Sequence, residues 1–117
     1  MNLDSFLNYC LAKKGVEETF PFNESTLVLK VGGKMFALAD TVEFTSINLK
    51  CDPERAIELR ECFMGIQPGY HMSKKHWNTI QMQLDVDDKL LMELIDHSYH
   101  LIVESLPKKV RNEVEVG

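Results

Sequence analysis

The first apolar residues of the chain recur with the spacing of one helix face. They occupy positions i, i+3, i+4, i+7 and i+8, namely Leu3, Phe6, Leu7, Cys10 and Leu11. This stripe predicts an amphipathic helix near the N-terminus. Asn2 is suited to the N-cap, and Gly15, which follows two lysines, is typical of a helix end.

Segments with β character follow this helix. The stretches 26–31 and 34–39 are apolar and flank Gly32 and Gly33. Two glycines between such stretches predict a tight hairpin, because the turn needs positive φ angles. Across 44–51 apolar and polar residues alternate, and this alternation predicts a half-buried strand.

A second helix is predicted to begin after Asp52, because Pro53 suits the first helical position and Glu54 suits the positive end of the helix dipole. Gly65 is expected to end it. Its apolar face consists of Ala56, Leu59, Cys62 and Phe63. We therefore expect Cys62, like Cys10 in the first helix, to be a small core residue.

Two more strands are predicted at 66–72 and 77–84, around a turn at 73–75. In the second of them, Ile80 and Met82 share one face, whereas Trp77 and Thr79 share the other. Their alternation predicts a second hairpin whose tip carries cationic residues.

The last part of the chain predicts a long helical region that begins at the acidic caps of 85–88. Its apolar stripe runs from Leu90 to Leu106, with a break expected near 97–98, and Pro107 ends it. The order α-βββ-α-ββ-α(α) predicts an α+β fold, with a mostly antiparallel sheet of two hairpins plus a strand and helices on one face. The expected core includes Leu7, Leu59, Phe63, Leu94 and Ile102.

Length and composition limit the classes of protein that fit. The 117 residues predict a single domain spanning 1–117, and a net charge of -5 argues against extensive polyanion binding but not against a local basic patch. The three cysteines form no CxxC pair, which is typical of a reducing compartment. The first residues do not resemble a signal peptide, and no apolar run approaches the roughly 20 residues of a membrane span. We expect a cytoplasmic protein with no membrane partner.

Catalytic and metal-binding patterns are weak in this sequence. Ser73 lies near His71 and His76, but a GxSxG motif is lacking and a serine in a turn is the simpler interpretation. The pair His97 and His100, like the pair His71 and His76, has no third ligand at a recognisable spacing. The acids of 85–88 are explained by helix capping, and phosphate-binding glycine motifs do not occur. We therefore expect neither an enzyme nor a cofactor.

The stretch PGYHMSKKHWNTI at 68–80 is the most unusual part of the chain, because it combines a turn, cations and the one tryptophan. If its two strands pair, Lys74 and Lys75 lie at a hairpin tip between His71 and His76, with Trp77 close by. A projecting ribbon of this kind suits a nucleic-acid-binding wing. The alternatives are ordinary surface lysines and a tryptophan that covers a second small core.

This stretch, together with SYHLIVESLPKK at 98–109, resembles the MmcQ/YjbR family of small bacterial proteins. The opening segment 7–22 and VGGKMFAL at 31–38 also match the style of the family. The resemblance covers nearly the whole chain and is most specific at 76–79. One departure is Lys14, where many members have proline, and it concerns a helix end.

The resemblance implies a CyaY-like α+β fold and a DNA-binding role through a "double wing" of β-hairpins, an analogy of fold. The wings would be the hairpins at 32–33 and 74–75. Their expected DNA contacts are Lys30 and Lys34 on the first wing, with His71, Lys74, Lys75, His76 and Trp77 on the second; the tail would add Lys108, Lys109 and Arg111. The partner would be double-stranded DNA, bound weakly. The alternative is an adaptor whose sheet face, with Trp77 and Tyr70, docks a protein partner.

Overall fold

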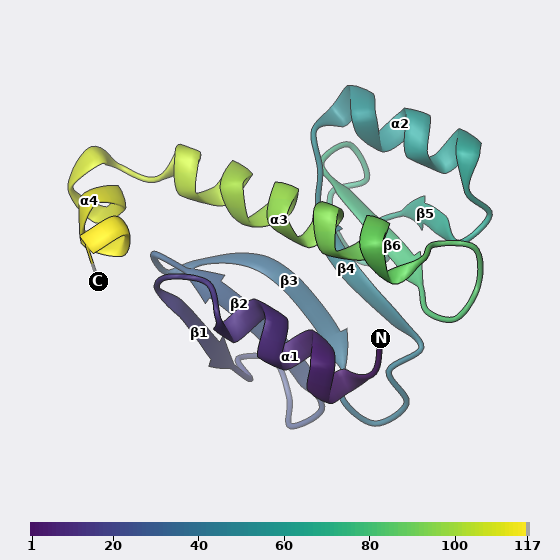
Figure 1. Cartoon of the computed structure of the whole chain (residues 1–117), viewed down its shortest axis with the longest axis horizontal. Helices are drawn as coiled ribbons and strands as arrows, with labels where there is room; N and C mark the ends of the chain where they lie inside the picture. Colours follow the sequence, from purple (N-terminus) through teal and green to yellow (C-terminus); the bar gives the residue numbers. More distant parts are fainter. Residues whose placement is uncertain (117) are drawn as a thin grey trace.

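Six strands form one antiparallel sheet in the computed structural model, which describes residues 1–116 (Figure 1). Along the chain they are β1 (Val16–Thr19), β2 (Thr26–Val31), β3 (Lys34–Asp40), β4 (Ser46–Lys50), β5 (Ile66–Pro68) and β6 (Trp77–Gln81). In the sheet they lie in the order β1-β2-β3-β4-β6-β5. The predicted α+β class with an antiparallel sheet is confirmed.

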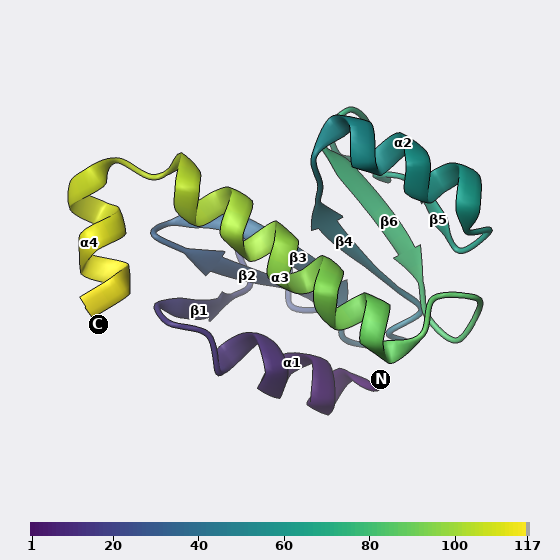
Figure 2. The same cartoon turned by 45° about the horizontal axis from the view of Figure 1, so that its top comes forward.

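Four helices accompany the sheet: α1 (Leu3–Leu11), α2 (Pro53–Cys62), α3 (Asp88–Ser105) and α4 (Lys108–Val116). Figures 1 and 2 show α3 running diagonally across the strands, with α1 beside it and α2 near β5 and β6. Apolar residues of all four helices join one core on the same side of the sheet. The opposite side has no helix among the described residues, as the sequence predicted.

The main core lies between the sheet and the helices. Phe6 of α1, Phe36 of β3 and Ile95 of α3 are fully buried there, and the rings of Phe36 and Tyr99 meet edge to face with centroids 5.5 Å apart. Of the residues expected in the core, Leu94 and Ile102 are buried, whereas Leu7, Leu59 and Phe63 are partly buried at its edge.

The hairpin predicted at Gly32 and Gly33 is present. Both glycines have positive φ, 58° and 82°, as a tight turn between twisted strands requires. A Cβ on Gly32 would lie 2.6 Å from a methyl carbon of Leu106, so the hairpin tip also rests closely on the junction between α3 and α4. The register shifts between Leu29 and Lys30, and this bulge turns both Phe36 and Ala37 of β3 into the core.

Four details differ from the expectations. Helix α3 continues through 97–98 without the expected break. Strand β1 was not predicted, because two of its four residues are glutamates and its only strand partner within residues 1–116 is β2, which lies further along the chain. Strand β5 has three residues and β6 has five, so the two strands are joined by loop 69–76 instead of the expected tight turn. Strand β5 ends at Pro68, which has no N–H to donate, and the backbone at His71 has a positive φ of 59°. Cys62 was expected in the core but is exposed, because α2 packs through a narrow stripe in which only Ala56 is buried. The buried cysteines are Cys10 and Cys51.

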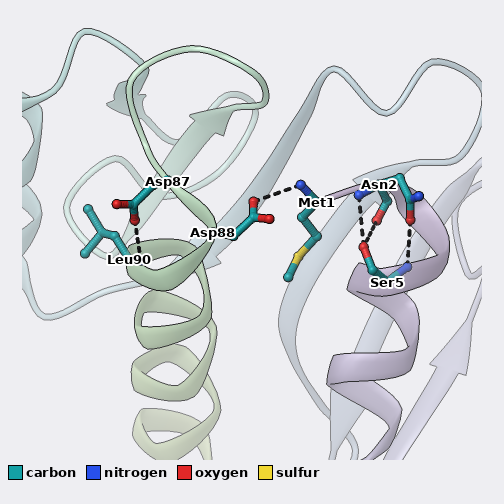
Figure 3. A network of polar contacts seen from close by, with 6 residues as sticks. All are labelled: Met1, Asn2, Ser5, Asp87, Asp88 and Leu90. Atoms are coloured by element: carbon teal, nitrogen blue, oxygen red, sulfur yellow. Dashed lines mark hydrogen bonds and ion pairs between the residues drawn. The ribbon is translucent and has the colours of Figure 1, made fainter.

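Helix caps formed where the sequence placed them. Asn2 makes a reciprocal capping box with Ser5, and the side chain of Asp87 accepts from the backbone N–H of Leu90 at 2.8 Å (Figure 3). The ammonium group of Met1 lies 2.8 Å from a carboxylate oxygen of Asp88. These contacts bring the first turns of α1 and α3 side by side. Of the acids in 85–88, Asp87 therefore caps α3 as expected, whereas the carboxylate of Asp85 accepts from the backbone N–H groups of Met64 and Gly65 instead of capping that helix.

Candidate functional site

The candidate site is the uncovered face of the sheet, meaning the side that faces away from the four helices. Alternation along the strands sends every second side chain to this face. The strand register aligns four of them in one row across the sheet: Val28, Leu38, Asn48 and Thr79. The row is apolar at β2 and β3 and polar at β4 and β6.

Trp77 belongs to this face but is not available to a partner. It is 8% exposed and packs with Val28 and Leu38 in a small second cluster, against which Met35 and Met72 also lie. The sequence left two roles open for Trp77, and the structure supports the second small core. Trp77 thus joins β6 to the central strands from the uncovered side.

Loop 69–76, which connects β5 to β6, is fixed from the sheet. The N–H of Gly69 donates to the carbonyl of Trp77 at 2.8 Å, and the N–H of Tyr70 donates to the hydroxyl of Thr79, also at 2.8 Å. The Thr79 hydroxyl in turn donates to the amide oxygen of Asn48. The start of the loop is therefore bound to two strands of the uncovered face.

Arg60 of α2 fixes the other end of the loop. Its Nε donates to the amide oxygen of buried Asn78 at 2.7 Å, and one Nη donates to the carbonyl of Trp77 at 3.2 Å and to that of Lys74. A charged donor to carbonyl groups makes stronger hydrogen bonds than a neutral one. The helix on the covered side thereby positions the lysine-bearing turn.

Cations gather at one end of the uncovered face. Lys30 pairs with Met35 across β2 and β3, and Lys50 pairs with Trp77 across β4 and β6. Both lysines alternate with core residues, so their side chains belong to the uncovered face. The register thus places Lys30 and Lys50 two strands apart, about 10 Å for an ideal sheet.

Loop 69–76 adds two exposed lysines, Lys74 and Lys75, which lie shortly before Trp77 at the start of β6. His71 and His76 are exposed in the same loop, and Lys34 is exposed at the first hairpin tip. Sequence reasoning missed Lys50, although its alternation with Ile47 and Leu49 was visible. The basic end is not uniformly positive, because Glu17 of β1 lies opposite Lys30.

A groove occupies the other part of the uncovered face, with a volume of about 510 Å³. Its floor is formed by the sheet residues Thr26, Leu38, Ala39, Ser46 and Asn48. Its rim comes from two loops that are distant in sequence, through Phe22 on one side and Tyr70, His71 and Met72 on the other. Phe22 is 64% exposed and Tyr70 is 70% exposed, which is unusual for aromatic rings on adjoining loops.

Two features order the groove. The rings of Tyr70 and His71 lie 4.0 Å apart, and His71 holds a left-handed backbone conformation that is sparsely populated for residues other than glycine. Such conformations persist where the surroundings enforce them and are frequent at functional sites. Asp40, at the end of β3, also lines the groove, and its oxygens accept from the N–H groups of Val42 and Glu43 at 3.1 and 3.3 Å.

Other polar groups on the covered side act structurally. Asp96 of α3 accepts hydrogen bonds from Tyr9 and Lys13 of α1, and Lys13 lies 4.7 Å from the ring centroid of Tyr9. Burial and the hydrogen bond to Asp96 raise the pKa of Tyr9 to about 12. Burial alone would raise the pKa of Asp96, but the bonds from Lys13 and Tyr9 outweigh it and lower that pKa. This network ties α1 to α3.

His97 and Ser73, two of the candidates from the sequence, make structural contacts. The Nε2 atom of His97 in α3 accepts a hydrogen bond from the backbone N–H of Asp52 at 3.1 Å. This bond connects the start of α2 to α3. Burial, followed by the charge of Arg55, lowers the pKa of His97. Ser73 accepts helical-turn hydrogen bonds through its carbonyl in loop 69–76. Among residues 1–116, three or more His, Cys, Asp or Glu side chains do not converge as a metal site would require.

Comparison with known proteins places the chain among bacterial relatives. The family model described as YjbR matches residues 11–101. The protein YbdF of Escherichia coli O157:H7 is 37% identical over 103 residues, which cover 87% of this chain and 84% of YbdF. The protein YjbR of Escherichia coli K12 is 32% identical over 112 residues, which cover 95% of each chain. Both are named as uncharacterized proteins.

Solved structures show the same fold. The crystal structure of DR2400 from Deinococcus radiodurans, a DUF419 domain protein, superposes with a TM-score of 0.90 at 40% identity and covers 97% of this chain and 88% of its own. A crystal structure from Pseudomonas syringae gives a TM-score of 0.74 at 28% identity, over 86% of this chain and 98% of that one. Separately, no helix within residues 1–116 is long and apolar enough to cross a membrane.

Proposed function

The chain belongs to the YjbR family, and we propose that it is a non-enzymatic binding module whose contact surface is the uncovered face of its sheet. The observation that carries this proposal is the placement of Lys30 and Lys50 at one end of that face, with exposed Lys74 and Lys75 shortly before Trp77, the residue that pairs with Lys50. The partner that suits this basic end is double-stranded DNA, contacted through its phosphates.

The chemistry of the chain supports binding rather than catalysis. Burial raises the pKa of Cys10 to about 12 and that of Cys51 to about 11, so neither thiol is a nucleophile at neutral pH. Three free cysteines suit a cytoplasmic protein, which is the location we propose. With a net charge of -5 and Glu17 beside Lys30, DNA affinity should lie at the weak end of the non-specific range, about 10⁻⁴ M at physiological salt.

The test is a salt series of duplex DNA binding with two double variants. Three to five cationic contacts predict a log–log slope of about -3 to -4 on duplex DNA. Lys74→Glu with Lys75→Glu should abolish binding and leave the melting temperature unchanged, because both side chains are exposed. The matched control is Lys108→Glu with Lys109→Glu, which changes the net charge equally. These tail lysines were expected to add DNA contacts, but they stand in α4, whose Val110 and Val114 pack on the main core rather than on the uncovered face, so this variant should retain most binding.

Two results would reject DNA as the partner. One is the absence of binding by the wild-type protein at low salt and pH ~6. The other is equal loss in both double variants, which would indicate a response to net charge alone.

A second candidate function, docking of a protein partner, is favoured by the groove. Its rim presents Phe22 and Tyr70 to solvent above a floor that combines Leu38 and Ala39 with polar residues, and exposed aromatic side chains are common in protein-binding hot spots. Phe22→Ala with Tyr70→Ala should weaken capture of such a partner without affecting DNA binding. A double variant that lost DNA binding as well would contradict a separation of the two surfaces.

A further inference from the structure

The groove on the uncovered face differs in charge from the rest of that face. Among the described residues, Asp40 is the one carboxylate in its lining, which also contains one histidine, His71, but no Lys or Arg. The cations of the same face lie at its opposite end, near Lys50 and Trp77. An anionic group, such as a phosphate, would therefore meet the carboxylate of Asp40 in the groove without a lysine or arginine to balance it.

The rim adds a second preference for cations. The faces of aromatic rings attract positive charge, and Phe22 and Tyr70 are largely exposed on the two sides of the groove. The Asp40 carboxylate is held in place by the N–H groups of Val42 and Glu43. Because a carboxylate has about four acceptor positions, two of them remain for a ligand.

We propose that this groove binds an arginine side chain of a partner protein. A guanidinium group is flat, stacks on aromatic rings and donates two parallel hydrogen bonds to a carboxylate, so it satisfies both the rim and Asp40. The compact ammonium group of lysine matches Asp40 but stacks less well. A volume of about 510 Å³ accommodates the side chain with part of its backbone.

This inference deepens the second candidate function and is independent of DNA binding. It is tested by NMR titration of the isotope-labelled protein with compounds of one shape and different charge. Benzamidine should shift the amides of Leu38, Asn48 and Tyr70 and bind about fivefold more tightly than neutral benzamide, because cation–π and carboxylate contacts favour the charged form. Benzoate should not bind.

Variants locate the source of the preference. Asp40→Asn keeps an oxygen for the turn and should reduce the benzamidine preference to about twofold or less, since the carboxylate charge is lost. Glu43→Gln removes a neighbouring charge outside the groove lining and should leave the preference unchanged. An equal effect of both substitutions would overturn the assignment to Asp40.

A peptide pair distinguishes a protein partner from a free small molecule. Capped Gly-Arg-Gly should shift the same amides more than its citrulline counterpart. Shifts by benzamidine with none by the arginine peptide would overturn the protein source in favour of a free aromatic cation. Equal binding of benzamidine and benzamide would reject the arginine proposal and leave a docking groove without charge selectivity. If no compound shifted any amide, both the arginine proposal and the second candidate function would be rejected.

Discussion

The two faces of the sheet are apolar for different purposes. On the covered face, Leu29 of β2 is fully buried beneath the helices and belongs to the main core. On the uncovered face, Leu38 of the neighbouring β3 is 7% exposed and is covered by Trp77 and nearby side chains instead of a helix. The comparison teaches that the covered face supports the fold, whereas the uncovered face combines a thin apolar layer with exposed contact groups.

The largest expected effect comes from truncating the covered face. Leu29→Ala should lower the free energy of unfolding by about 3–5 kcal/mol, because the cavity lies within a packed core. Leu38→Ala, the same change on the other face, should cost less, about 1–3 kcal/mol, because the groove lets solvent and side chains fill the space. Denaturant unfolding of the two variants measures the difference. Equal losses would show that the uncovered face is packed as firmly as the core.

Removing Arg60 should give an intermediate effect that reaches both faces. Arg60→Ala leaves the amide oxygen of buried Asn78 and the carbonyls of Trp77 and Lys74 without this donor. The expected loss is about 1–3 kcal/mol, the cost of an unsatisfied buried polar group. Arg60→Lys should recover only part of it, since lysine lacks the forked geometry. A neutral Arg60→Ala variant would mean that loop 69–76 is held by the sheet alone.

Acid should weaken the covered face through His97. The lowered pKa means that the unfolded chain binds the proton first, so the free energy of unfolding falls as pH drops below about 6.5 and is fully retained above it. His97→Asn should flatten this dependence between pH ~7 and ~5. Thermal melts of both proteins across this range provide the measurement. A wild-type curve no steeper than that of the variant would contradict the assignment.

The smallest stability effect is expected at the groove rim. Phe22→Ala with Tyr70→Ala should change the free energy of unfolding by about 0.5 kcal/mol or less, because both side chains are largely exposed. The same variant removes the aromatic rim that we assign to binding. A large loss of stability in denaturant titrations would show instead that these rings serve the fold.

Local chemistry explains which elements the sequence could predict. The caps at Asn2, Asp52 and Asp87 all occur as expected, because a capping side chain needs only a backbone N–H three residues away. The hairpin at Gly32 and Gly33 likewise depends on its own φ angles. The α+β class followed from the order of such elements, and the family comparison agrees with it.

Features that depend on distant contacts were not predictable in the same way. Strand β1 forms only by pairing with β2, and loop 69–76 takes its shape from Arg60, Thr79 and Asn48, none of which adjoins it in sequence. The groove combines the segment around Phe22 with that loop, and no periodicity links the two. Lysines 74 and 75 were placed correctly on the surface, but their use in DNA binding stays a prediction.

The Arg60 contacts also govern local opening of the native protein. Because one side chain of α2 donates to carbonyls at both ends of the 74–77 turn, this turn loses those hydrogen bonds if it leaves the sheet while the last turns of α2 stay docked. The two segments should then open as a single cooperative unit, with matched amide hydrogen-exchange rates, although one borders the core and the other faces solvent. Motion at the partner-binding side is in this way linked to a helix on the opposite side of the sheet.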